Sequence, residues 1–185
     1  MSMLIPSLRS TKVLIVGKGP GWELTRDFLY TDYNIWAIPQ SYGNLEVMAG
    51  NRVDLVFEVH DPKAWRKKRA ILRRLNDLCS PPKLIVPQRF APWTNNSYLL
   101  PVEEIRKFGL PLLNSFAWMI AYALHRGATA IALRGVNLDY ANEALHERDS
   151  MMYLLGYLKS SGITLDIEFS SGLMQGNTLW QTIIS

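Results

Sequence analysis

Short apolar runs and helix-like segments alternate along the sequence from Lys12 to Ile167. The first run, Lys12–Val16, is rich in β-branched residues and is closed by glycines, which is typical of a strand that is buried on both faces. Strands that alternate with helices pair in parallel through right-handed crossovers. The sequence therefore predicts an α/β fold, a Rossmann-like open parallel sheet of about six strands with helices on both faces. The six predicted strands cover residues 12–16, 34–38, 54–59, 83–87, 130–133 and 164–167.

The segments between these strands carry apolar residues at helical spacing. Helices are predicted over residues 22–30, 62–79, 115–127 and 149–161, with a short helical stretch at 102–108. Asn114 and Ser115 are suited to cap the helix that follows them. Residues 88–113 contain several prolines and are predicted to form an irregular excursion or a lid. Since 185 residues suit one domain, residues 1–185 are expected to form a single α/β domain.

Composition excludes several classes of protein. Cys79 is the only cysteine, so the chain cannot form an internal disulfide, a multi-cysteine zinc site or a C-x-x-C redox pair. No apolar run approaches the roughly 20 residues that span a bilayer. The N-terminal residues lack the features of a secretory signal. The chain is therefore expected to be soluble and cytoplasmic, with no membrane contact.

The net charge of +4 comes from one segment, residues 63–74, which holds seven lysines and arginines and no acid. Clustered basic residues neutralise the phosphates of nucleic acids, so this predicted helix is a candidate nucleic-acid contact. The alternative is the solvated outer face of an ordinary amphipathic helix. The sequence leaves both interpretations open.

A glycine-rich turn follows the first strand: Gly17, Lys18, Gly19, Pro20 and Gly21. In an open parallel sheet, ligands bind at the carboxyl ends of the strands, near the point where the strand order reverses. Glycines let the backbone turn sharply and approach a ligand, and the next helix is expected to present free N–H groups to an anion. Phosphate is the expected ligand. The pattern is neither the dinucleotide fingerprint nor the P-loop, and a tight turn without a ligand is the alternative.

The third strand ends in Glu58-Val59-His60-Asp61, which places an imidazole between two carboxylates. Such a group can move a proton or bind a metal, so His60 and Asp61 are candidate catalytic residues. Asp61 precedes Pro62 and is equally suited to cap a helix. No metal ligands are assigned, and whether a divalent metal takes part is left open.

Polar residues also follow the fifth strand. Gly135 and Asn137 lie in the loop directly after it, and His146 and Arg148 lie further along, before the next predicted helix. His146 is a candidate general acid or base, and Arg148 can pair with phosphate oxygens in bidentate fashion. The alternative is a surface loop in which Asp149 caps the helix.

Three of these segments, in this order, resemble the sialyltransferase-like superfamily: residues 12–21, Asn114-Ser115 at the start of an alanine-rich helix, and residues 131–137. The superfamily includes bacterial sialyltransferases and hydroxymethylpterin pyrophosphokinase-like domains. The chain is more similar still to small uncharacterised proteins of tailed bacteriophages. That similarity depends on F-E-x-H-D at residues 57–61 and E-x-x-x-x-R-x-x-x-x-Y-L-x-G at residues 143–156.

The resemblance implies a nucleotide pocket. In the sialyltransferases, the glycine-rich turn, the start of the alanine-rich helix and a histidine before the last long helix surround a CMP-sugar. These features correspond to Gly17–Gly21, to Asn114 and Ser115, and to His146 as candidate base. The implied cofactor is a nucleotide or nucleotide sugar, and the implied partner is a phosphorylated small molecule.

Three positions depart from the family pattern. Lys18 replaces an asparagine, Gly21 replaces a serine, and Pro39 lies near the position of a second nucleotide-contacting asparagine. The resemblance therefore implies a nucleotide donor without specifying sialic acid.

Three hypotheses about function follow. The first is a phage transferase, active in the host cytoplasm, that moves a sugar or phosphoryl group from a nucleotide donor to nucleic acid or to a nucleotide. In it Lys18 holds phosphate and His146 deprotonates the acceptor. The second is a non-catalytic protein that sequesters a nucleotide and so antagonises a host defence. The third is a nucleic-acid-binding accessory that uses the basic helix.

Overall fold

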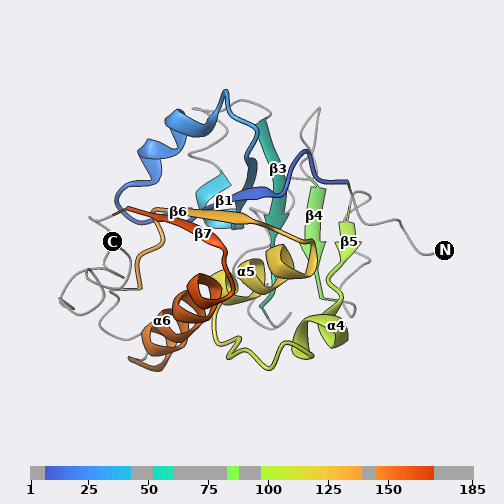
Figure 1. Cartoon of the computed structure of the whole chain (residues 1–185). Coiled ribbons are helices and arrows are strands. Elements are labelled where there is room, and N and C mark those ends of the chain that lie inside the picture. The colour runs from blue at the N-terminus through green and yellow to red at the C-terminus, as the bar shows by residue number, and fades with distance from the viewer. Residues whose placement is uncertain (1–6, 43–51, 61–82, 88–96, 139–144, 169–185) are drawn as a thin grey trace.

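The computed structural model describes residues 7–42, 52–60, 83–87, 97–138 and 145–168. Within them lies a seven-stranded sheet with the order β5-β4-β3-β2-β1-β6-β7. Every pair of neighbouring strands is parallel, so the predicted open parallel α/β sheet is confirmed (Figure 1). The strands are β1 (Lys12–Val16), β2 (Asn34–Ala37), β3 (Val53–Phe57), β4 (Lys83–Val86), β5 (Ser97–Leu99), β6 (Ala130–Arg134) and β7 (Thr164–Ile167).

Helices cover both faces of the sheet. On one face lie α4 (Val102–Arg106), α5 (Ser115–His125) and α6 (Leu145–Ser160), which are below the sheet in Figure 1. The other face carries the 3₁₀ helix η1 (Trp22–Phe28), drawn in blue. Residues 39–42 are also helical.

Alternate residues of each central strand belong to two separate hydrophobic clusters. Val13 and Ile15 pack with residues of α4, α5 and α6, whereas Leu14 and Val16 pack with Phe28 of η1. These four side chains of β1 are fully buried. This arrangement explains the continuous apolar runs, because a strand with a helix on each face has no polar side.

The seventh strand, β5, was not expected from the sequence. It pairs with β4 through Ser97, Tyr98 and Leu99, inside the segment 88–113 that was predicted to be irregular. A strand of three residues is too short to show a period-2 pattern, and its burial decreases from Ser97 to the exposed Leu99. The predicted short helix at 102–108 corresponds to α4. Residues 88–96 and the basic segment 63–74 lie outside the described residues.

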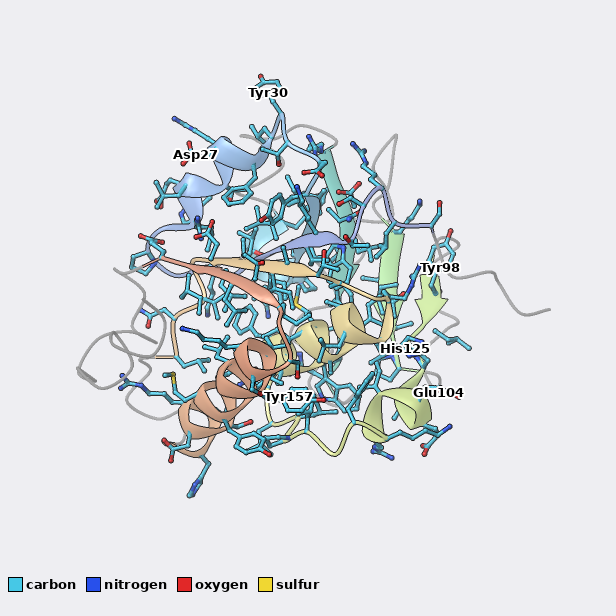
Figure 2. All side chains as sticks on the ribbon, viewed as in Figure 1. Asp27, Tyr30, Tyr98, Glu104, His125 and Tyr157 are labelled. Atoms are coloured by element: carbon cyan, nitrogen blue, oxygen red, sulfur yellow. The ribbon has the colours of Figure 1, made fainter. Side chains whose placement is uncertain are left out.

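Two helices differ from their predicted bounds. Helix α6 begins at Leu145, four residues before the predicted start, so Asp149 lies inside the helix and does not cap it. The segment predicted as a helix over 22–30 is the 3₁₀ helix η1, which ends at Phe28. Beyond it Tyr30 projects away from the sheet, with 97% of its surface exposed (Figure 2).

The strand order reverses at β1. The chain moves from β1 through β5 towards one edge, and it then returns to place β6 and β7 on the other side of β1. The carboxyl ends of β1 and β6 therefore flank the position where such sheets bind ligands. Among the described residues, no helix combines the length and the hydropathy that a membrane span requires.

Candidate functional site

The glycine-rich turn after β1 packs directly against the turn after β6. The amide of Gly17 donates to the carbonyl of Arg134 at 2.9 Å, and the amide of Gly19 donates to the carbonyl of Gly135 at 2.8 Å. A Cβ atom on Gly17 would overlap the carbonyl oxygen of Gly135, and one on Gly19 would lie 2.7 Å from the Cβ of Asn137. These glycines therefore allow two backbones to approach each other closely.

This packing changes the role that the sequence predicted for the turn. The amides of Gly17 and Gly19 donate to carbonyls of the neighbouring loop and are not available to an anion. At the start of η1, the carboxylate of Glu168 lies against Gly21 and occupies the space that a side chain there would need. The turn itself is thus filled by protein groups, and the space for a ligand lies beside it.

A cavity of about 280 Å³ opens beside the turn. Its walls come from the segments that follow β1, β2, β3 and β6, together with the start of α5 and Glu147 of α6. This is the carboxyl edge of the sheet at the strand-order reversal, where the sequence analysis expected the ligand. Seven residues predicted from the sequence line the cavity: Lys18, Gly19, His60, Asn114, Ser115, Gly135 and Asn137.

The remaining predicted residues do not line this cavity. Gly17 is buried beneath the turn, and Pro20 is exposed on its outer side. His146 is exposed and Arg148 half-buried in the first turns of α6. Asp61 lies outside the described residues.

The amino end of α5 forms one wall of the cavity. Asn114 has extended backbone angles, φ −139° and ψ 171°, and its Oδ1 accepts a hydrogen bond from the amide of Ala117 at 2.9 Å. The predicted cap is therefore confirmed. The first-turn amides of Ser115 and Phe116 have no acceptor within the helix, and the helix dipole places partial positive charge there. With Lys18 on the same cavity, this wall is suited to bind an anion.

His60 is held by a buried carboxylate. Glu58 directly follows β3, and its side chain is fully buried. Its Oε1 accepts a hydrogen bond from the backbone amide of His60 at 3.1 Å and lies 2.5 Å from the His60 Nδ1. An ionised Glu58 accepts a hydrogen bond from the Nδ1–H tautomer of His60, and that tautomer carries its lone pair on Nε2. A histidine oriented in this way is equipped to accept a proton.

Sequence reasoning missed the pairing of Glu58 with His60 and the position of Gln40. The Oε1 of Gln40 and the Oδ1 of Asn137 are buried, and neither has a hydrogen-bond partner in the described part of the chain. Both residues line the cavity, and a side-chain amide can turn to present either its oxygen or its nitrogen to a ligand. A signal for Gln40 was present: it follows Pro39, the position near which the family resemblance implies a nucleotide-contacting asparagine.

The described residues include no cluster of three or more His, Cys, Asp or Glu side chains that could hold a metal ion.

No protein-family model and no curated protein matches this chain. Solved structures of sialyltransferases do match it. The monofunctional α-2,3-sialyltransferase Cst-I from Campylobacter jejuni is 13% identical, with a TM-score of 0.60, over 98% of this chain and 82% of that one. CstII from Campylobacter jejuni, in complex with the substrate analogue CMP-3FNeuAc, is 17% identical, with a TM-score of 0.57, over 92% and 83%. CstII with a trisaccharide acceptor and CMP is 16% identical, with a TM-score of 0.56, over 92% and 84%.

These comparisons show a sialyltransferase-like fold. The resemblance stated from the sequence is confirmed at that level, while its bacteriophage and pyrophosphokinase parts stay predictions.

Proposed function

We propose that the cavity binds a nucleotide sugar through a single phosphate and that the protein transfers the sugar to a hydroxyl group of an acceptor. The observation that carries this proposal is the Glu58–His60 pair, since His60 lines the same cavity as Lys18 and the amino end of α5. A histidine oriented by a buried carboxylate is the arrangement of a general base, and this favours transfer over binding alone.

The charge of the cavity supports one phosphate rather than two or three. Among the described lining residues, Lys18 is the single lysine or arginine, and Glu147 contributes a carboxylate. The amino end of a helix adds the equivalent of roughly half a positive charge. Each further phosphate would add negative charge without another cation among the described lining residues to meet it. A nucleoside monophosphate ester therefore fits better than a nucleoside di- or triphosphate.

Gln40 and Asn137 support a nucleobase as part of the ligand, since both line the cavity. A side-chain amide can accept a hydrogen bond from an amino group and donate one to a carbonyl, as the edge of a nucleobase requires. Cytosine carries an exocyclic amino group, and CMP is the nucleotide named for two of the similar structures. CMP is therefore the first nucleotide to test.

The transfer step uses His60 as a general base. The Nε2 atom takes the proton of the acceptor hydroxyl while the acceptor oxygen bonds to the anomeric carbon of the sugar. The bond from that carbon to the phosphate oxygen breaks, and the nucleoside monophosphate leaves with the electron pair. Lys18 and the α5 amides stabilise the charge on the departing phosphate. Glu58 stabilises the imidazolium that forms on His60.

The binding part of the proposal is tested by calorimetry with CMP, CDP and CTP. CMP should bind most tightly, and Lys18→Ala should weaken its binding by about tenfold, the equivalent of one lost ionic contact of roughly 1.4 kcal/mol. Lys159→Ala removes an exposed lysine at the far end of α6 and should leave the affinity unchanged. Tighter binding of CTP than of CMP would contradict the single-phosphate assignment.

The catalytic part is tested by comparing two histidines. With a radiolabelled CMP-sugar and a panel of glycoside acceptors, His60→Ala should lower kcat by roughly 10²–10⁴-fold, the usual contribution of a general base. His146→Ala should leave kcat unchanged, because His146 does not line the cavity. A loss of kcat in His146→Ala, with kcat unchanged in His60→Ala, would instead support His146 as the base, as the sequence analysis predicted. A wild-type protein that returns the labelled donor intact would instead be a sequestering protein.

A further inference from the structure

A second cavity of about 400 Å³ adjoins the candidate site. The two cavities share two lining residues, Val59 and Trp118, and His60 directly follows Val59 in the chain. The remaining walls of the second cavity come from Pro87 after β4, from Leu100 after β5 and from α4. His60, the proposed base, therefore lies next to the boundary between the two cavities.

The walls of the second cavity differ in character from those of the first. Five of the lining residues are apolar: Val59, Pro87, Leu100, Val102 and Trp118. The two charged ones, Glu103 and Arg106, have opposite signs and pair with each other at 3.4 Å. Their side chains are 78% and 62% exposed, so they lie towards solvent. The described lining is therefore apolar with a polar margin and carries no net charge.

This chemistry selects the kind of ligand. A second phosphorylated ligand would meet no excess positive charge here, whereas a neutral ring could pack its apolar face on the apolar walls. The indole of Trp118 offers a flat surface for such a ring. Glu103 accepts hydrogen bonds from hydroxyl groups, and Arg106 donates hydrogen bonds to them. An apolar cavity with a few polar groups at one side is the usual form of a small-molecule site.

We propose that the second cavity binds an uncharged, hydroxyl-bearing ring, a sugar or a nucleoside, which is the acceptor of the group that leaves the nucleotide in the first cavity. The part of this inference that concerns transfer rests on the proposed function, because it needs His60 as the base. The binding of an uncharged ring does not depend on the proposed function.

The test measures binding of uncharged rings in the absence of any nucleotide, by saturation-transfer NMR. The probes are methyl β-galactoside, methyl α-glucoside and uridine. The two glycosides test whether the cavity binds a sugar, and uridine tests whether it binds a nucleoside. At least one probe should bind the wild-type protein. Val102→Trp fills the cavity from α4 and should weaken that binding by at least tenfold. Arg106→Ala removes a polar contact and should weaken it several-fold.

Two control variants test whether the ring binds in the second cavity and not elsewhere. Lys107→Ala removes the neighbouring exposed lysine, which does not line the cavity, and should leave binding unchanged. Lys18→Ala changes only the first cavity and should also leave it unchanged. The inference is overturned if no probe binds, if both Val102→Trp and Arg106→Ala bind like the wild type, or if Lys18→Ala abolishes binding. Thermal unfolding of each variant shows whether a loss of ring binding comes from misfolding. If Val102→Trp does not fold, the binding measured with Arg106→Ala decides whether the inference holds.

The outcomes separate the two proposals. If an uncharged ring binds as expected but CMP does not bind, the proposed function is contradicted and the second binding site is supported. If the protein turns over a CMP-sugar and neither Val102→Trp nor Arg106→Ala changes the KM for the acceptor, the proposed function stands. The second cavity is then not the acceptor site. If both proposals hold, Arg106→Ala raises the KM for the acceptor while the KM for the donor stays constant.

Discussion

At the scale of single residues, the contact between the two glycine-containing turns decides the geometry of the site. Gly135 has a φ of +61°, and a Cβ atom there would lie 2.8 Å from both the carbonyl oxygen of Gly19 and the Cβ of Trp22. Neither neighbour is the flexible end of a side chain. The turn after β1 and the turn after β6 therefore hold each other in position, and they fix Lys18 and Asn137 at the edge of the cavity.

Three glycine-to-alanine substitutions separate backbone strain from close packing. Gly162 has a φ of +78° with nothing within 4 Å of an added Cβ, so Gly162→Ala should cost only the strain of the left-handed conformation, about 1–2 kcal/mol. Gly17→Ala would place its Cβ against the carbonyl oxygen of Gly135 and 3.1 Å from the ring of Phe116, a clash without left-handed strain that should cost at least roughly 1–3 kcal/mol. Gly135→Ala combines a milder clash, at 2.8 Å, with left-handed strain, so Gly17→Ala and Gly135→Ala should both cost more than Gly162→Ala. Urea unfolding measures the three free energies, and a Gly135→Ala no less stable than Gly162→Ala would contradict this account.

Two histidines illustrate what residue type alone could predict. His60 and His146 were both chosen from the sequence because each lies near the end of a strand or the start of a helix. The structure places His60 on the cavity beside the buried carboxylate of Glu58, and it places His146 on the exposed part of α6. The sequence shows that Glu58 is two residues from His60, but burial of the carboxylate depends on how the sheet packs.

At the scale of elements, α5 connects stability to ligand binding. Its cap, Asn114, bonds the amide of Ala117 through Oδ1, and its Nδ2 lies 3.5 Å from the carbonyl of Glu147. The same residue lines the cavity beside the first-turn amides, which have no acceptor within the helix. One side chain therefore caps the start of the helix and shapes the place proposed for phosphate.

Asn114→Asp should separate these two roles. Aspartate caps helices as well as asparagine, so the free energy of unfolding should change little, whereas Asn114→Ala should lose about 1 kcal/mol. The aspartate carboxylate would compete with phosphate at the positive end of the helix, so CMP should bind several-fold more weakly. Chemical denaturation and calorimetry on the two variants measure these effects. Equal affinity for CMP in Asn114→Asp and the wild type would count against phosphate at α5.

At the scale of the whole molecule, one aromatic cluster joins the sheet to α5. The ring centroids of Trp36, Phe57 and Tyr122 lie 5.1–5.5 Å apart, and all three side chains are buried. The hydroxyl of Tyr122 accepts a hydrogen bond from Arg126 at 2.9 Å. Burial raises the pKa of Tyr122 above its ordinary value of 10.0, while the hydrogen bond and the charge of Arg126 act in the lowering direction.

This raised pKa predicts how global stability depends on pH. Below pH 10 the phenol is neutral in both the folded and the unfolded chain and contributes no pH dependence. Above pH 10 the unfolded chain releases the proton first, so stability falls as the pH rises, by at most about 1.4 kcal/mol per pH unit from this group. Tyr122→Phe should remove that part of the slope, and Tyr30→Phe, at an exposed position, should not. Urea unfolding from pH 8 to pH 11 provides the comparison.

The sequence by itself determined the α/β class, because continuous apolar runs between helical segments have few other solutions. It also identified the cap of α5 and seven residues of the cavity, since strand ends and helix caps are marked locally by Gly, Asn and Ser. The three-residue strand β5 left too little pattern to be recognised.

Only the tertiary structure decided which polar groups act together. The pairing of β1 with β6 brings Gly17 and Gly135, which are more than a hundred residues apart in the sequence, into contact. It also engages the amides of Gly17 and Gly19 in hydrogen bonds within the protein. The burial of Glu58 and the open space beside α5 arise in the same way. The contact between the two turns joins segments that are distant in the sequence, and even the burial of Glu58, two residues from His60, depends on how the sheet packs.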